Sequence, residues 1–333
     1  MKKCISVLCI FGLMVGISLF GGNIQKAVAQ EIKLNYVAFM PVKAFDISEF
    51  KRLFIDRINE KAKGELTIVL RGGPEIVPYF EQALAVQKGT IQLGTIPSAF
   101  FGNIVPGANA IRLSEITPFE ERENGADDLI RKQYEKSGFY YLGRKEHQDS
   151  GFFYMFLNKR VEKPKDFVGL KIGGSPAFHA FIKGLGATVV SVTPAEYHSA
   201  LERGVVDGLC TILSAWAVTG LSEVTKYVID HPFYTTTPVV VVNLDTWKTI
   251  PPHLQDLMRE TLIETQESWP QLIGKVNTGI RKKTEAAGIE YIKFSPKDAQ
   301  WFLDTAYSEA WKEAEKLTPG DFIPKLKKLI SKQ

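Results

Sequence analysis

The residues from position 31 onward alternate between apolar and polar side chains in two distinct ways. Residues 32–39 (IKLNYVAF) alternate with a period of two, which predicts a strand. Residues 46–64 instead carry apolar side chains at helical spacing and end in Gly64, a good helix stop. Residues 66–70 (LTIVL) are rich in β-branched side chains and predict a second strand. A strand, a helix and a strand in about 40 residues form a βαβ unit, which implies parallel strands.

The same order of elements recurs further along the chain. Strands are expected at 90–96, 138–143, 151–158, 169–174 and 237–244, and helices at 78–89 and 176–186. Beyond residue 250 the pattern becomes helical, over 251–269, on to about 287, and again over 295–317 with Ser295 as cap. Pro270 should kink or interrupt the first of these helices. Alternating strands and helices predict an α/β fold.

One polar stretch, EYHSALERGVVDG (196–208), raises the question of a catalytic cluster. Three residues before it, Thr193 is a natural helix cap and Pro194 occupies the first helical position. Glu196 falls three residues after the cap, so its carboxylate is expected to bond the backbone N–H of Thr193 in a capping box. This placement explains the glutamate without any chemistry.

The rest of this stretch predicts a helix and its exit. The apolar face is formed by Tyr197, Ala200 and Leu201, and the solvent side by His198, Glu202 and Arg203. Gly204 should end the helix with a positive φ, and a strand that turns at Gly208 should follow. Asp207 is expected to bond local backbone rather than to act as a base.

An internal echo links two distant parts of the chain. Residues 85–94 (AVQKGTIQLG) resemble residues 200–209 (ALERGVVDGL), and Glu81 falls opposite Glu196. Two lobes would then use the same helix–glycine–strand device. Coincidence is the alternative, because helix stops are often written in this way.

The first thirty residues have the character of an export signal. Lys2 and Lys3 precede an apolar run over about residues 5–20, and the segment ends Ala27-Val28-Ala29. A membrane anchor is the alternative, but the run is short for a spanning helix. We therefore predict a signal peptide over 1–29 and a periplasmic protein of 304 of the 333 residues, a length that suits two lobes.

Charge and cysteine content exclude several classes of partner. Removing residues 1–29 takes away three lysines and no acid, so the net charge falls from +4 to +1. A nearly neutral chain has no electrostatic footprint for nucleic acid or an anionic membrane. Cys210 alone remains of the three cysteines, so no intramolecular disulfide can form.

The sequence gives little support for an enzyme. It contains none of the motifs G-x-S-x-G, G-x-x-x-x-G-K-[ST] or H-E-x-x-H, and its five histidines lack metal-ligand spacing. His198 and Cys210 invite a base–nucleophile pairing, but the apolar strand around Cys210 indicates an inert buried thiol. We expect no catalytic residues, no metal and no cofactor.

Two longer segments resemble a known family. KPKDFVGLKI (163–172) and GLGATVVSVTPAEYHSALERGVVDG (184–208) are similar to the DctP-like solute-binding proteins of tripartite ATP-independent periplasmic (TRAP) transporters. Residues 85–94 and 239–255 resemble other segments of the same family, so the resemblance covers essentially the whole chain after residue 30.

The resemblance implies a fold and a function. The fold would be a two-lobe periplasmic-binding-protein fold with crossing strands and a long hinge-spanning helix. One lobe would hold 31–150 and 239–278, and the other 151–238 and 279–333. A monomer would trap a small organic acid between the lobes, close about the hinge and deliver its ligand to TRAP-type membrane permease subunits. A binding protein of an ABC importer or a membrane sensor is the alternative, because its fold would be similar.

The sequence departs from the family where an acid ligand is usually bound. Most members carry an arginine after GLKI that pairs with the ligand carboxylate, and this chain has Gly173 there. A second common arginine aligns with Phe153. Either another arginine supplies the charge, with Arg71 and Arg144 at strand ends as candidates, or the ligand is less acidic or partly aromatic.

Residues after the predicted strand ends favour a partly apolar ligand site. The aromatic candidates are Phe39, Phe45, Tyr79, Phe101, Phe153, Trp216 and Tyr234, although each could equally pack in a core. Polar contacts are expected from Thr95, Ser98, Thr211 and Ser214. The family often has an acidic or amide pair after VVDG, where this chain has Cys210 and Thr211, which again suggests a changed ligand.

Overall fold

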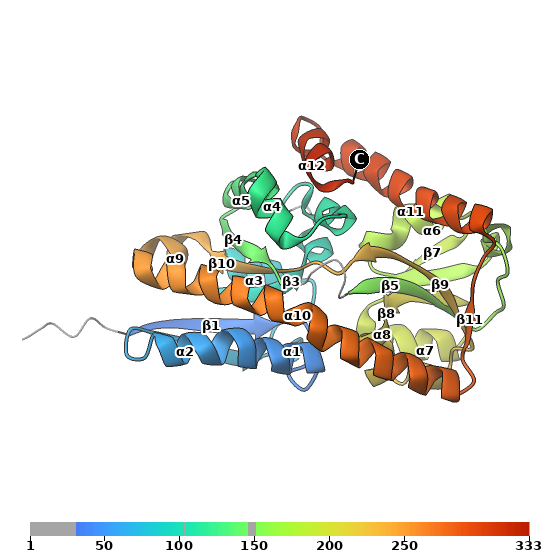
Figure 1. Ribbon diagram of the computed structural model, residues 1–333, viewed down its shortest axis with the longest axis horizontal. Helices are drawn as coiled ribbons and strands as arrows, with labels where there is room; N and C mark the ends of the chain where they lie inside the picture. The colour runs from blue at the N-terminus through green and yellow to red at the C-terminus, as the bar shows by residue number, and fades with distance from the viewer. Residues whose placement is uncertain (1–30, 103, 146–150, 333) are drawn as a thin grey trace, which may run out of the picture. The chain divides into compact units, whose positions relative to one another are not determined.

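The fold is described from a computed structural model, which covers residues 31–102, 104–145 and 151–332. The predicted signal peptide, 1–29, lies outside these residues. Two mixed β-sheets with flanking helices form two lobes, as the resemblance implied (Figure 1). Among the described residues, no helix has the length and apolar character needed to cross a membrane.

The first lobe is built on a five-stranded sheet with the order β2-β1-β3-β10-β4. Its strands are β1 (Ile32–Ala38), β2 (Leu66–Gly72), β3 (Leu93–Pro97), β4 (Phe139–Arg144) and β10 (Pro238–Asn243). Strand β1 pairs in parallel with β2 and β3, which confirms the predicted βαβ unit, whereas β10 is antiparallel to β3 and β4.

The second lobe is built on a six-stranded sheet with the order β11-β9-β5-β8-β6-β7. Its strands are β5 (Phe152–Leu157), β6 (Lys171–Gly174), β7 (Thr188–Ser191), β8 (Gly208–Ile212), β9 (Tyr227–Thr235) and β11 (Glu290–Ile292). Strand β8 begins at Gly208, where the sequence had predicted a turn, because Asp207 still belongs to the connection from the preceding helix.

Helices cover both sheets. They are α1 (Phe45–Phe50), α2 (Asp56–Lys61), α3 (Gln82–Gln87), α4 (Pro118–Asn124), α5 (Ala126–Glu135), α6 (His179–Gly184), α7 (Tyr197–Glu202), α8 (Leu213–Val218), α9 (Leu244–Thr249), α10 (Pro252–Ala286), α11 (Pro296–Leu317) and α12 (Phe322–Ile330). A π-helical segment over Lys51–Ile55 joins α1 to α2, and a 3-10 helix, η3, spans Ala108–Leu113. Ser295 caps α11 as predicted, by accepting a hydrogen bond from the backbone N–H of Asp298.

The longest helix, α10, packs on elements of both lobes (Figure 1). It is continuous over 35 residues, so Pro270 does not interrupt it; the kink that the sequence offered as the other outcome stays a prediction. Buried side chains on both sides of the proline, Trp269 and Ile273, hold the helix against its neighbours, which offsets the one backbone hydrogen bond that proline removes. The lobes are also joined through Thr235–Thr237, between β9 and β10.

The C-terminal helix α12 contacts α11 and also α4 and α5. Its end is tied to the first lobe, since the backbone N–H of Glu115 donates to the carbonyl of Ile330 at 2.8 Å. The exact division of the chain between the two lobes stays a prediction, and α12 lies against helices of both.

The internal echo is confirmed as a shared hydrogen-bonding pattern. The N–H of Ile91 donates to the carbonyl of Ala85, and the N–H of Val206 donates to that of Ala200, both at 3.2 Å. Gly89 and Gly204 stand at the helix ends with φ of 71° and 66°. The two sheets also have the same order of strand directions. Counted from β2 in one sheet and from β7 in the other, three parallel strands are followed by one antiparallel strand and then by one in the original direction, so the lobes repeat one scaffold.

Candidate functional site

A cavity of about 150 Å³ lies between the two lobes, at the carboxyl ends of four parallel strands. Phe39 follows β1, Ala99 follows β3, Ser175 follows β6 and Ser214 follows β8. Ligands of open α/β sheets bind at this edge, because the connections there diverge and leave room. The position of the cavity is therefore a consequence of the repeated scaffold.

Aromatic rings make up much of the cavity wall. They belong to Phe39, Phe45, Phe100, Phe153, Phe178 and Tyr197. Phe39 and Phe100 pack with their ring centroids 4.5 Å apart, and Phe153 meets Phe178 edge-on at 4.7 Å. The rings thus form one cluster on each lobe, which gives the cavity two apolar walls.

Arg112 brings a positive charge to this apolar cavity. It lies on η3, is only 3% exposed, and its Nη1 donates to the carbonyl of Asn109 at 2.6 Å. Its Nε and Nη2 are buried and have no hydrogen-bond partner among the described residues. Burial lowers the pKa of this guanidinium, while Tyr234 and Glu313 oppose that change. A buried cation with two free donors calls for an anionic partner.

The guanidinium of Arg112 packs on the ring of Tyr234. The guanidinium carbon lies 4.9 Å from the centroid of the Tyr234 ring, within the range of a cation–π contact. The Tyr234 hydroxyl donates to the carbonyl of Ala306 at 2.6 Å. Tyr234 has a φ of 45°, unusual for a bulky residue, in the strand that leads into the crossing between the lobes.

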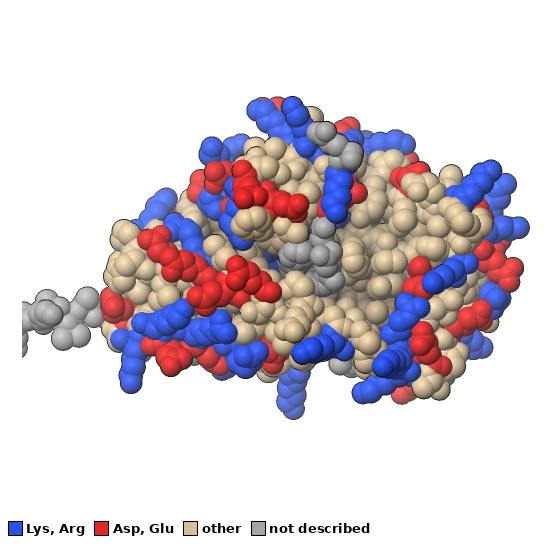
Figure 2. All heavy atoms as spheres, viewed as in Figure 1, with Lys and Arg blue, Asp and Glu red and all other residues tan. Residues whose placement is uncertain are grey.

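A negative charge reaches the same cavity from the first lobe. Asp46 stands in the first turn of α1 and lines the cavity, with its side chain 26% exposed. Its Oδ2 lies 3.5 Å from Nζ of Lys145, which is fully buried and rests 4.1 Å from the ring centroid of Trp269. Charged side chains elsewhere on the visible surface follow the outer helices, and the area between α10 and α11 is mostly uncharged (Figure 2).

Four of the predicted ligand residues line the cavity: Phe39, Phe153, Thr211 and Ser214. Phe45, the further aromatic candidate, lines it as well. Tyr79 lies behind this surface, with its ring 4.9 Å from that of Phe39. Their placement follows from the strand ends that the sequence indicated, although ligand contact by any of them stays a prediction.

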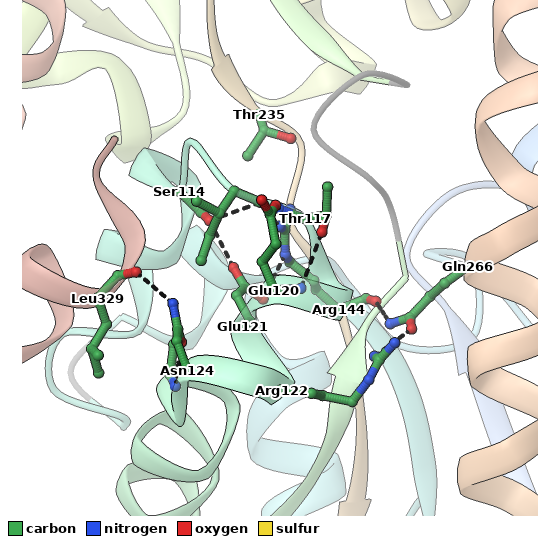
Figure 3. Close-up of polar contacts among 12 residues, drawn as sticks. Ser114, Thr117, Glu120, Glu121, Arg122, Asn124, Arg144, Thr235, Gln266 and Leu329 are labelled. Atoms are coloured by element: carbon green, nitrogen blue, oxygen red, sulfur yellow. Dashed lines mark hydrogen bonds and ion pairs between the residues drawn. The ribbon is translucent and has the colours of Figure 1, made fainter. Parts of the chain in front are cut away.

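Neither predicted arginine lines the cavity. Arg71 is exposed on β2 and donates through Nε to Asn35 at 2.7 Å. Arg144 is buried, but its Nε donates to Glu121 at 2.9 Å and its Nη2 to the carbonyl of Ile116 (Figure 3). Gln266 of α10 bonds the Arg144 carbonyl in the same cluster (Figure 3). Neither of these two arginines is therefore placed to supply a charge to this cavity.

The other predicted polar residues have structural partners. Thr95 accepts a hydrogen bond from Tyr36 at 3.0 Å, and Ser98 shares one with Thr237 at 2.5 Å. A Cβ on Gly173 would meet Val192 at 2.8 Å, so that position faces the packing of the second lobe. Thr95, Ser98 and Gly173 do not line the cavity, whereas Thr237, the partner of Ser98, does.

Three further candidates are buried in the core. Trp216 donates from its indole to Thr225 at 2.9 Å, Tyr234 supports Arg112 as described, and Phe101 packs edge-on against Tyr134. Cys210 is also buried, and burial raises the pKa of its thiol, in keeping with the inert role predicted for it.

The polar stretch 196–208 is structural. The capping box is present, since Glu196 accepts from the backbone N–H of Thr193 at 2.7 Å, and this bond holds the pKa of Glu196 below its ordinary value. Asp207 accepts from the backbone N–H of Lys171 at 2.8 Å, as expected for a local backbone partner. The sequence reasoning missed both charged residues of the cavity wall, Asp46 and Arg112; the signal of Arg112 is a single cation within the mostly apolar run ANAIRL.

Comparisons with known proteins agree with this geometry. The family described as "Bacterial extracellular solute-binding protein, family 7" (DctP) matches residues 45–317. A solute-binding protein of Albidiferax ferrireducens is 21% identical over 273 residues, 79% of each chain. A monocarboxylate 2-oxoacid-binding periplasmic protein of Nostoc sp. is 22% identical over 256 residues, 72% of this chain and 68% of the relative.

A solved structure shares the fold. It is a TRAP periplasmic solute-binding protein from Desulfovibrio salexigens with bound orotic acid, 17% identical, with a TM-score of 0.79 over 90% of this chain and 99% of that one. At this identity the likeness speaks for the fold alone.

Proposed function

The chain belongs to the DctP family of bacterial extracellular solute-binding proteins, and from this premise we propose that it captures a small organic acid with an apolar or aromatic body in the cavity between its lobes. Proteins of this family are extracytoplasmic transport proteins rather than enzymes. The proposal includes export of the chain to the periplasm, directed by the predicted signal peptide, and delivery of its ligand to a TRAP-type permease.

Arg112 is the observation that carries the proposal. Its free Nε and Nη2 are adjacent donors on one edge of the guanidinium, the arrangement that pairs with both oxygens of a carboxylate. An occupied Nη1 and the ring of Tyr234 fix the orientation of that edge. A ligand carboxylate would satisfy a buried cation that otherwise remains without its two hydrogen bonds. Arg112 thereby takes the role that the family usually gives to the arginine replaced by Gly173.

The apolar part of the proposal rests on the size and walls of the cavity. A volume of about 150 Å³ is close to that of an engineered core cavity that accepts benzene. Phe39 and Phe100 on one lobe and Phe153 and Phe178 on the other can contact two faces of a flat or branched ligand. The similar protein from Desulfovibrio salexigens was solved with bound orotic acid, a carboxylic acid on a flat ring.

A ligand screen with matched arginine variants tests this function. Aromatic acids, aliphatic carboxylates, sulfonates and polyols are screened by thermal shift, and hits are measured by calorimetry. We expect carboxylates with an apolar body to bind, and Arg112→Gln to weaken them about 100-fold because two charge-assisted bonds are lost. Arg71→Gln, at an exposed arginine outside the cavity, is the control and should bind like the unchanged chain. Hits confined to short dicarboxylates, or equal affinity in Arg112→Gln, would refute the proposal.

Delivery and closure need separate measurements. Ligand that binds both lobes should favour a closed arrangement, so small-angle scattering should show a more compact chain at saturation. Uptake of the ligand by cells that express a TRAP-type permease should require this chain. Unchanged scattering at saturation contradicts closure, and uptake without the chain contradicts delivery.

A further inference from the structure

The charges that reach the cavity are few. Among the described residues that line it, Arg112 and Asp46 are the only side chains of the Asp, Glu, Lys and Arg types. Both come from the first lobe, whereas the second lobe contributes hydroxyl groups and aromatic rings, among them Ser175, Thr211 and Phe178. The cavity therefore offers one guanidinium and one carboxylate in an otherwise uncharged wall.

Asp46 presents its charge to the cavity and not to its lysine partner alone. Lys145 lies 3.5 Å from Asp46, is fully buried beneath α1 against Trp269, and does not line the cavity. The carboxylate of Asp46 is still partly exposed, and it also lines a smaller pocket beside Ser214 and Ile273. Asp46 thus contacts a buried lysine and at the same time forms part of the cavity wall.

We propose that Asp46 is a specificity-determining residue that restricts the ligand to a single carboxylate. The inference rests on the proposed function, in which Arg112 pairs with that carboxylate. A second carboxylate would find no free guanidinium in the described wall and would be buried near a like charge, where repulsion is strong because little water screens it. In a cavity of about 150 Å³ a small ligand has little room to turn its second acid group elsewhere.

The Asp46 carboxylate also limits which groups can stand at the end of the ligand that lies next to it. The Asp46 carboxylate accepts hydrogen bonds, so a hydroxyl, amide or amine group of the ligand can donate to it. An apolar end can lie against Phe45 and Ala44, which line the cavity next to Asp46. The ligand class is therefore a monocarboxylate whose far end is apolar or carries a hydrogen-bond donor.

Matched pairs of acids test this selectivity. Benzoate is compared with isophthalate, and butanoate with succinate, by calorimetry on the chain without residues 1–29. We expect the monocarboxylate of at least one pair to bind at least about tenfold more tightly than its partner. Asp46→Asn should reduce that ratio about tenfold by strengthening the dicarboxylate, because the repelling charge is removed. Asp46→Glu keeps the charge and should keep the preference.

Each outcome bears on a stated part of the inference. Equal affinity for the two members in both pairs, or an unchanged ratio in Asp46→Asn, overturns the role of Asp46 while leaving the proposed function intact. Failure of every carboxylate to bind overturns the proposed function, and with it the inference. A purely structural role for Asp46 would lower thermal stability in both variants and leave the ratio of affinities unchanged. If Asp46→Asn does not fold, loss of the preference in Asp46→Glu overturns the inference.

Discussion

The two lobes share a backbone plan and differ in the side chains that fill it. In the first lobe the amide of Gln92 accepts a hydrogen bond from the backbone N–H of Asn35 at 3.1 Å. In the second lobe Asp207 accepts from the N–H of Lys171 at 2.8 Å, at the equivalent position. A neutral group and a charged group thus close the same junction between helix and strand.

The difference is larger at the cavity. Arg112 and Asp46 place both charges in the first lobe, and the second lobe supplies uncharged groups. The repeated scaffold therefore sets where the cavity lies, whereas residues outside the repeat supply its charges. Three pairs of substitutions in the scaffold probe how far the equivalence of the lobes extends, beginning with the largest expected effect.

Gly208→Ala should distinguish the lobes most strongly. A Cβ at Gly208 would lie 2.7 Å from the carbonyl oxygen of Phe156, a backbone atom that cannot turn away. The first lobe has a buried leucine, Leu93, at the equivalent position, so this tightness belongs to the second lobe alone. We expect a loss of about 3 kcal/mol in the free energy of unfolding, measured by denaturant titration.

The control for Gly208→Ala is Gly94→Ala in the first lobe. Its added Cβ would meet only the side-chain ends of Ile96 and Val86 at 3.1 Å, which can shift. A smaller loss is therefore expected. Equal losses in the two variants would show that the β5–β8 contact is no tighter than its counterpart.

Asp207→Asn should lower the free energy of unfolding by an amount that depends on pH. Burial works to raise the pKa of Asp207, but hydrogen bonds from Lys159 and from the backbone N–H of Lys171 outweigh it and hold the pKa below its ordinary value. Because its pKa is lower in the folded chain than in the unfolded chain, the ionised Asp207 carboxylate stabilises the fold above about pH 4. This stabilisation is lost as the pH falls through the pKa of the folded state. We expect a loss of about 1–2 kcal/mol at pH 7 and a much smaller loss near pH 3.

Gln92→Ala is the matched variant in the first lobe, because an amide does not titrate in this range. Its loss of unfolding free energy should be the same at both pH values. A loss in Asp207→Asn that is equally independent of pH would contradict the electrostatic difference between the two junctions.

Gly89→Ala and Gly204→Ala should have small and nearly equal effects. Both glycines have a positive φ, and an added Cβ at either site meets no atom closer than 3.6 Å. Backbone strain alone is expected to lower the free energy of unfolding by about 1 kcal/mol in each variant. The matching fall in melting temperature is measured by thermal denaturation. A clear difference between the two would show that the helix exits are not equivalent.

Much of the fold follows from local patterns. The strand at 66–70, the capping box of Thr193 and Glu196, and the stop at Gly204 each depend on residues within a few positions of one another. Pro270 does not interrupt its helix, because the outcome also depends on the packing of Trp269 and Ile273 against other elements. Local chemistry therefore predicts elements better than it predicts how a long helix responds to a defect.

The charge of the site was beyond local reasoning for the same physical cause. Arg144 follows a strand as expected, yet Glu121, 23 positions earlier, binds its guanidinium. Arg112 stands on a short 3-10 helix, and its contacts with Tyr234 and Asn109 leave Nε and Nη2 without a hydrogen-bond partner among the described residues. Aromatic residues were easier to place, since Phe39 and Phe153 lie next to strand ends that the pattern indicates.

The contact between Arg112 and Tyr234 links a charged residue of the cavity wall to the crossing between the two sheets. Tyr234 is the last residue before Thr235–Thr237 carries the chain from one sheet to the other, and its hydroxyl is anchored on α11. Any rotation at this crossing displaces the ring on which the guanidinium rests. If the proposed binding and closure both occur, they are coupled through this contact, and a substitution at Tyr234 is expected to change the affinity and the extent of closure together.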